Sequence, residues 1–148
     1  GQIVITGETK VVEKAAEALK EAGAKRAVML NVSGPFHSPM MKPAGEELAK
    51  VLEKTELSEL QIPYVTNVTA EYVSDISETK ALLAEQVASS VRWQESMERM
   101  IAEGVDTFVE IGPGKTLAGF MRKINRNVKM YNIGTWEDVE KVTAELLA

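Results

Sequence analysis

Apolar and polar positions along this chain follow two periods in turn, one typical of strands and one of helices. Short apolar runs of strand length occupy residues 3–6, 25–32, 62–68, 107–111 and 129–133. Segments with apolar residues at spacings of three, four and seven predict amphipathic helices, and these occupy residues 9–22, 39–55, 77–88, 93–103, 117–124 and 136–148. Strands that alternate with helices indicate βαβ units, so we expect an α/β fold with a mostly parallel sheet.

Local signals mark where several of these helices begin. Ser38 followed by Pro39 is typical of a helix start, with serine as the cap and proline as the first helical residue. Ser77 is expected to cap the helix that follows it. Thr135 and Asp138 have the spacing of a capping box, which predicts the start of the last helix.

Composition and charge narrow the class of protein. Apolar residues make up 45% of the chain and charged residues 26%, as in an average globular domain with one core. The net charge of -5 argues against binding to nucleic acid or to an anionic membrane surface. No apolar run approaches the ~18 residues of a membrane span. The lack of cysteine and the single histidine argue against a metal site, so we expect a soluble cytoplasmic domain that binds no metal, membrane or nucleic acid.

The first residues are unusual for the start of a gene product. The chain opens on Gly1 without a methionine and enters an apolar strand almost at once. We therefore expect these residues to be a portion of a longer protein, in which case the lack of a targeting segment says nothing about that protein.

The one histidine, His37, lies in a loop between the strand over 25–32 and the helix over 39–55. Gly34 and Pro35 restrict the path of this loop, and open α/β sheets carry their chemistry at such strand ends. Because imidazole titrates near neutral pH, a catalytic base is one interpretation. A structural histidine is the other, since no serine lies in a G-x-S-x-G elbow and no partner acid is evident.

Three further features are candidates for chemistry, each with a simpler interpretation. Gly112-Pro113-Gly114 lies between a strand and a helix, where free N–H groups bind phosphate. It matches no nucleotide-binding motif, and we favour a tight structural turn. Asn67 ends its strand and is either a cleft residue or an ordinary turn asparagine. Gln86 lies near an apolar helix face and is either functional or a hydrogen-bonded buried amide.

Four blocks of sequence, taken together and in order, resemble a known family. They read VSGPFHSPMMKPA (32–44), PYVTNVTAE (63–71), EQVASSVRWQESMERM (85–100) and FVEIGPGKTLAGF (108–120). In these blocks the chain resembles the C-terminal half of the malonyl-CoA:acyl carrier protein transacylase family of bacterial type II fatty acid synthesis. The resemblance runs across nearly the whole chain, and the GPFHS and EIGPGKTL blocks are its most specific part.

The resemblance implies an architecture of two subdomains. Residues 1–33 would be the C-terminal βαβ portion of a ferredoxin-like small subdomain, and residues 34–148 the C-terminal part of an α/β-hydrolase-like large subdomain. The family's nucleophile elbow, its oxyanion-hole glutamine and its carboxylate-pairing arginine would lie in an N-terminal half that is absent here. A ferredoxin-like sheet cut in half leaves an unpaired edge.

The resemblance also implies roles for four residues in a ping-pong transfer of malonyl through a malonyl-serine ester. His37 matches the histidine that acts as general base and then general acid. Gln86 matches the residue whose backbone carbonyl orients that histidine in place of a triad acid. Phe36 matches a position associated with extender-unit choice, where a bulky ring disfavours an α-methyl group, and Asn67 matches an asparagine near the cleft.

The implied partners are malonyl-CoA, phosphopantetheinylated acyl carrier protein and the missing N-terminal half of the same enzyme, with no resident cofactor. Without that half we expect this chain alone to be an inactive acyltransferase. The alternative is a non-catalytic fragment or module that is stable alone and binds a partner such as acyl carrier protein.

Overall fold

The computed structural model describes residues 2–148, which divide into two compact units, residues 2–92 and residues 93–148. Helices and strands occur in both units, which confirms the mixed α/β character expected from the sequence. No helix among the described residues has the length and apolar character needed to span a membrane.

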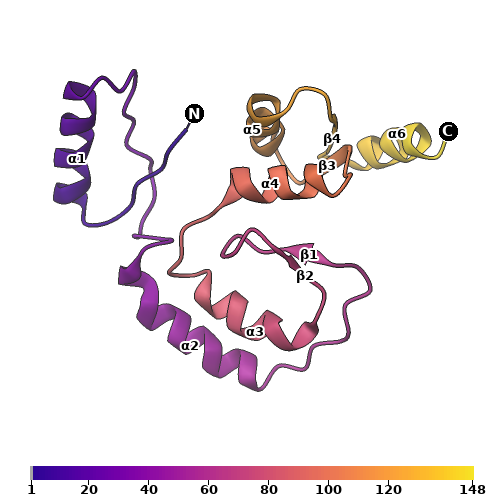
Figure 1. Ribbon diagram of the computed structural model, residues 1–148, viewed down its shortest axis with the longest axis horizontal. Helices are drawn as coiled ribbons and strands as arrows, with labels where there is room; N and C mark the ends of the chain where they lie inside the picture. Colours follow the sequence, from indigo (N-terminus) through magenta and orange to yellow (C-terminus); the bar gives the residue numbers. More distant parts are fainter. Residues whose placement is uncertain (1) are drawn as a thin grey trace. The chain divides into compact units, whose positions relative to one another are not determined.

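The unit 2–92 contains helices and a short hairpin. Its elements are α1 (Thr9–Glu21), the 3-10 helix η1 (Pro39–Met41), α2 (Lys42–Glu53), β1 (Tyr64–Val65), β2 (Tyr72–Val73) and α3 (Ile76–Glu85). Helices α2 and α3 pack along each other, as Figure 1 shows, and α3 also contacts β2. Helix α1 buries no residue.

The hairpin of β1 and β2 is antiparallel, with Tyr64 opposite Val73 and Val65 opposite Tyr72. The strand expected over 62–68 is therefore limited to two residues, because the chain turns directly after Thr66. The Tyr64 hydroxyl donates to Thr79 Oγ1 at 3.1 Å, which joins the hairpin to α3.

The strands expected over residues 3–6 and 25–32 are wrong for this structure, since neither segment pairs with another strand among the described residues. Their apolar side chains stay exposed; Ile3 is 90% exposed and Leu30 56%. A strand depends on a hydrogen-bonded neighbour, so an apolar run without one remains an irregular segment.

Two helix starts differ from the sequence prediction. The chain from Pro39 first forms the 3-10 turn η1, and the α-helix starts only at Lys42. The Ser38 hydroxyl does not cap this helix, because it donates to the Pro35 carbonyl at 2.6 Å. Helix α3 is capped by Asp75, whose side chain accepts from the Ser77 N–H at 2.8 Å, so Ser77 is not its cap.

The unit 93–148 contains a parallel β-α-β arrangement. Its elements are α4 (Trp93–Ala102), β3 (Thr107–Ile111), α5 (Thr116–Ile124), β4 (Lys129–Ile133) and α6 (Trp136–Leu146). Strands β3 and β4 pair in parallel from Thr107 opposite Lys129 to Ile111 opposite Ile133, with the residue bounds that the sequence predicted. The parallel sheet expected from the sequence is thus found in this unit, whereas the hairpin of the other unit is antiparallel.

Helices α5 and α6 contact β4 and bury a small core, while α4 packs on α5. Met97, Ala118, Met121 and Val142 are its buried apolar residues. The predicted capping box of α6 is confirmed, since Thr135 Oγ1 accepts from the Asp138 N–H at 3.3 Å and Asp138 Oδ2 accepts from the Thr135 N–H at 3.0 Å.

Candidate active site around His37

His37 has an unusual backbone conformation. Its φ of 58° lies in the left-handed region, which among the described non-glycine residues only Ala70 shares. A side chain in this region costs on the order of 1 kcal/mol and persists where the surroundings hold it. The conformation presents the exposed imidazole outside the regular elements, on the loop that leads into η1.

Two successive carbonyl groups at the end of α3 hold His37. Its backbone N–H donates to the Val87 carbonyl at 3.3 Å, and its Nδ1 lies 3.0 Å from the Gln86 carbonyl oxygen. A carbonyl oxygen only accepts, so Nδ1 carries a proton in this contact. In the neutral imidazole the lone pair is then on Nε2, the nitrogen that a general base uses.

The loop around His37 is fixed by its own hydrogen bonds. Ser38 is buried, and besides the bond from its hydroxyl to Pro35 its carbonyl accepts from the Met41 N–H at 2.9 Å. Pro35 and Pro39 restrict the backbone on both sides. The imidazole is therefore carried by a constrained turn, as a positioned base requires.

Asn67 and Gln86 lie together in a neighbouring hollow of the same unit. This hollow of about 170 Å³ is lined by Tyr64, Val65, Thr66, Asn67, Leu82, Leu83 and Gln86. The Asn67 carbonyl accepts from the Arg92 N–H at 3.0 Å, while its side-chain amide has no hydrogen-bond partner among the described residues. The structure thus brings His37 to Gln86 and Gln86 to Asn67.

Phe36 is adjacent to His37 in sequence but does not line this hollow. Its ring is 50% exposed and folds back over Gly34, where a Cβ added to the glycine would lie 3.3 Å from the ring carbon Cε2. The ring therefore covers the start of the loop, and Gly34 is the residue that leaves room for it.

The glycine-rich turn at residues 112–114 is a structural turn. The N-terminus of α5 is occupied by the Glu110 carboxylate, which accepts from the Leu117 N–H at 3.0 Å and the Ala118 N–H at 2.9 Å. Asn132 on β4 donates to the same carboxylate at 2.8 Å. An anion of the chain itself thus fills the place where a phosphate would bind.

These hydrogen bonds, from Ala118 above all, lower the pKa of Glu110 below its ordinary value of 4.5, although partial burial opposes the shift. Glu110, which links β3, α5 and β4, was not among the residues predicted from the sequence. The available signal was an acidic residue at the end of a strand, shortly before a helix start.

Across residues 2–148 no group of three or more His, Cys, Asp or Glu side chains is placed to hold a metal ion.

Comparison with known proteins relates the chain to acyltransferases. Residues 1–143 match the family described as acyl transferase domain. The malonyl CoA-acyl carrier protein transacylase of Bacillus subtilis (strain 168) is 49% identical over 140 residues, which are 95% of this chain and 44% of that protein. The transacylase of Staphylococcus aureus (strain COL) is 42% identical, over 95% of this chain and 46% of that protein.

Solved structures give the same relation. The acyl-carrier-protein-S-malonyltransferase of Bartonella henselae superposes with a TM-score of 0.90 at 41% identity, over 96% of this chain and 45% of that one. A type II PKS acyl-carrier protein in complex with its malonyl-transacylase contains a chain with a TM-score of 0.90 at 36% identity, over 94% and 45%. The chain thus spans about half the length of the relatives it matches.

Proposed function

Because this chain belongs to the acyl transferase domain family, we propose that it is the C-terminal part of a malonyl-CoA:acyl carrier protein transacylase. The observation that carries the proposal is the contact between His37 Nδ1 and the Gln86 carbonyl. It holds the imidazole as a base without a carboxylate partner, within a sequence block that matches the family.

The proposed reaction has two transfers, both of which use His37. In the first, a serine from the rest of the enzyme attacks the malonyl thioester while Nε2 takes the serine proton. The C–S bond breaks, the imidazolium returns the proton to the coenzyme A thiolate, and malonyl remains as a serine ester.

In the second transfer the pantetheine thiol of acyl carrier protein gives its proton to Nε2 and attacks the ester. The serine leaves and recovers the proton from the imidazolium. One base that accepts and returns a proton serves both directions, and the Gln86 carbonyl stabilises the imidazolium each time.

Phe36 and Asn67 are assigned to the substrate. The exposed ring of Phe36, the residue before His37, would occupy the space of an α-methyl group and so favour malonyl over methylmalonyl. The free side-chain amide of Asn67 is available for a polar group of the substrate. The imidazole of His37 is the only one of these groups assigned to the reacting atoms.

The remaining half of the enzyme is the proposed partner within the same protein. Residues 1–33 would complete a ferredoxin-like small subdomain with it, and residues 34–148 an α/β-hydrolase-like large subdomain. The exposed apolar side chains of residues 3–6 and 25–32 support this, since they have the composition of strands and lack a neighbouring strand. Malonyl-CoA and acyl carrier protein are the external partners, with fatty acid synthesis in the cytoplasm as the setting.

The test replaces His37 in the full-length protein that contains this chain. His37→Ala should lower malonyl transfer from coenzyme A to acyl carrier protein by about 10²–10⁴-fold, the usual contribution of a general base. Mass spectrometry should show a matching loss of malonyl-enzyme formation. Lys54→Ala, an exposed change in the same unit, serves as control, and transfer at the wild-type rate by a folded His37→Ala variant would rule the proposal out.

A further inference from the structure

The turn that follows β1 contains a buried residue with a left-handed backbone. Ala70 has a φ of 59° and is 4% exposed. Its N–H donates to the Thr66 carbonyl at 2.9 Å and closes the turn over residues 66–70. Backbone strain of this kind persists where the surroundings hold it, and such residues are concentrated at functional sites. The contacts that hold this turn therefore bear on the site beside it.

Arg92 holds this turn at two of its carbonyl groups. The backbone N–H of Arg92 donates to the Asn67 carbonyl at 3.0 Å, and its guanidinium Nη1 donates to the Thr69 carbonyl at 2.7 Å. A hydrogen bond from a charged guanidinium is stronger than one from a neutral donor. Thr66 adds a contact within the turn, since its Oγ1 accepts from the Val68 N–H at 3.3 Å. The backbone on either side of Val68 is thus tied to Arg92.

The turn carries Asn67, which is half-buried and lines the hollow that Gln86 also lines. Because Arg92 bonds the backbone of Asn67 itself, the place of the Asn67 amide depends on Arg92. The segment from Gln86 to Arg92 has a contact with the site at each end. The Gln86 carbonyl contacts His37 Nδ1 at its start, and Arg92 holds the turn at its end.

We propose that Arg92 is a positioning residue for the substrate side of this site, an inference that rests on the function proposed above. Arg92 acts through Asn67: its guanidinium fixes the turn 66–70, and the turn fixes the amide that meets a polar group of the substrate. Arg92 itself contacts no reacting atom in this assignment. Any residue other than proline at position 92 keeps the backbone bond to Asn67, so substitution isolates the contribution of the guanidinium.

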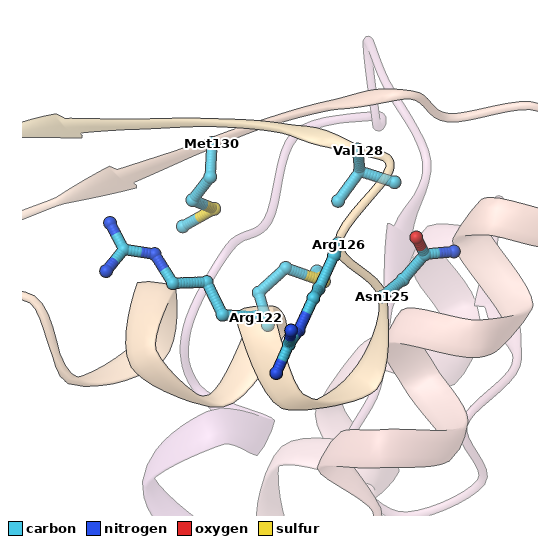
Figure 2. Close-up of a pocket in the computed structure, with 6 residues that line it drawn as sticks. Arg122, Asn125, Arg126, Val128 and Met130 are labelled. Carbon is cyan, nitrogen blue, oxygen red and sulfur yellow. The ribbon is translucent and has the colours of Figure 1, made fainter.

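Hydrogen exchange at the backbone amides of Val68 and Ala70 in the full-length protein tests the first step. Arg92→Gln removes the charged donor to Thr69, so both amides should exchange about tenfold faster, as for loss of a hydrogen bond to a charged group. Arg92→Lys should restore part of the protection, because an ammonium group still donates. Arg126→Gln changes an exposed arginine that lines a hollow beside α5 and β4 (Figure 2) and should leave both amides unchanged.

The kinetics of malonyl transfer by the full-length protein test the second step. Arg92→Gln should lower kcat/KM for malonyl-CoA by about tenfold, and Asn67→Ala should lower it at least as much. The variant with both substitutions should be no slower than Asn67→Ala alone, because two residues that act through one contact are not additive. A purely structural role of Arg92 would instead give losses that multiply.

Two results would overturn the inference. One is equal exchange of the Val68 and Ala70 amides in the wild type and in Arg92→Gln, whether or not the protein transfers malonyl. The other is multiplied losses in the double variant, since Arg92 would then act independently of Asn67. A folded wild type that transfers no malonyl would contradict the proposed function, and the exchange measurement would still decide whether Arg92 holds the turn.

Discussion

At the scale of single residues, His37 is oriented by the backbone of Gln86 and not by its side chain. Any residue at position 86 supplies the same carbonyl oxygen, whereas a carboxylate partner can be removed by one substitution. The orientation of the imidazole therefore depends on the path of the chain after α3.

Gln86→Ala should accordingly keep malonyl transfer within about two- to threefold of wild type, because the carbonyl remains. Loss of a carboxylate that orients a catalytic histidine costs about 10⁴-fold in kcat. The measurement is kcat/KM for malonyl-CoA in the full-length protein, with His37→Ala as the inactive reference. If kcat/KM fell by 10³-fold or more in a folded Gln86→Ala variant, the side chain of Gln86 and not its carbonyl would orient His37.

Phe36 gives a second prediction at this scale. Phe36→Ser removes an exposed ring from the residue before His37 and should shift relative kcat/KM toward methylmalonyl-CoA by about 1–3 kcal/mol, the worth of one methyl group in a pocket. Competition between the two thioesters measures the ratio, and Phe36→Tyr keeps the ring as control. If the ratio of the serine variant equals that of wild type, Phe36 has no part in the choice.

At the scale of helices and strands, the elements that the sequence predicted well are those whose partner strand or cap lies within the chain. β3 and β4 have matching apolar runs that pair with each other within the chain, and α6 begins at a capping box that four consecutive residues define. Residues 3–6 and 25–32 carry an equally apolar pattern, but a strand also needs a neighbour, which pattern does not report.

The candidate site also contains some features that the sequence could predict and others that it could not. His37 was identifiable from the sequence because it is the one histidine and lies in a restricted loop. The carbonyl groups of Gln86 and Val87 could not be found from residue types, because every residue has such a group. The pattern singled out only the side chain of Gln86, and the family resemblance pointed to its carbonyl. The left-handed φ of His37 also left no mark in the sequence, since asparagine or glycine is the usual residue there.

Glu110 carries the prediction at this scale, because its carboxylate joins β3, α5 and β4. Glu110→Gln removes a charge that accepts three hydrogen bonds and should lower the Tm by about 5 °C, as for a lost helix cap. Thermal unfolding, monitored by circular dichroism, measures the change in Tm. Glu137→Gln, an exposed change in the first turn of α6, is the control.

The stabilisation that the Glu110 carboxylate contributes should decrease as the pH falls. The folded pKa of Glu110 is below its ordinary value of 4.5, so its contribution is complete above that pH and is lost as the pH falls through the folded pKa. The Tm difference between wild type and Glu110→Gln should therefore be largest near neutral pH and shrink as the pH falls below 4.5. A difference that grows on acidification would contradict this assignment.

At the scale of the whole molecule, the chain would supply the proposed base, His37, without a nucleophile. It has no cysteine and no serine in an elbow, and it covers about half of the relatives it matches. We expect the chain alone to show no malonyl transfer, because thioester attack needs an activated nucleophile and oxyanion donors. Addition of the N-terminal half should restore transfer, and His37→Ala should abolish it again; activity of the chain alone would require another nucleophile.

The single imidazole of this chain also makes it a spectroscopic reporter. A sample labelled with nitrogen-15 in histidine contains one ring, so its two nitrogen signals belong to His37 without assignment. Their chemical shifts distinguish a protonated Nδ1 from a protonated Nε2. If the Gln86 carbonyl holds the ring as described, the Nδ1–H tautomer should dominate in the neutral ring. Unfolding would break this contact and remove the preference for that tautomer. The two ring-nitrogen signals would therefore report whether the site is intact.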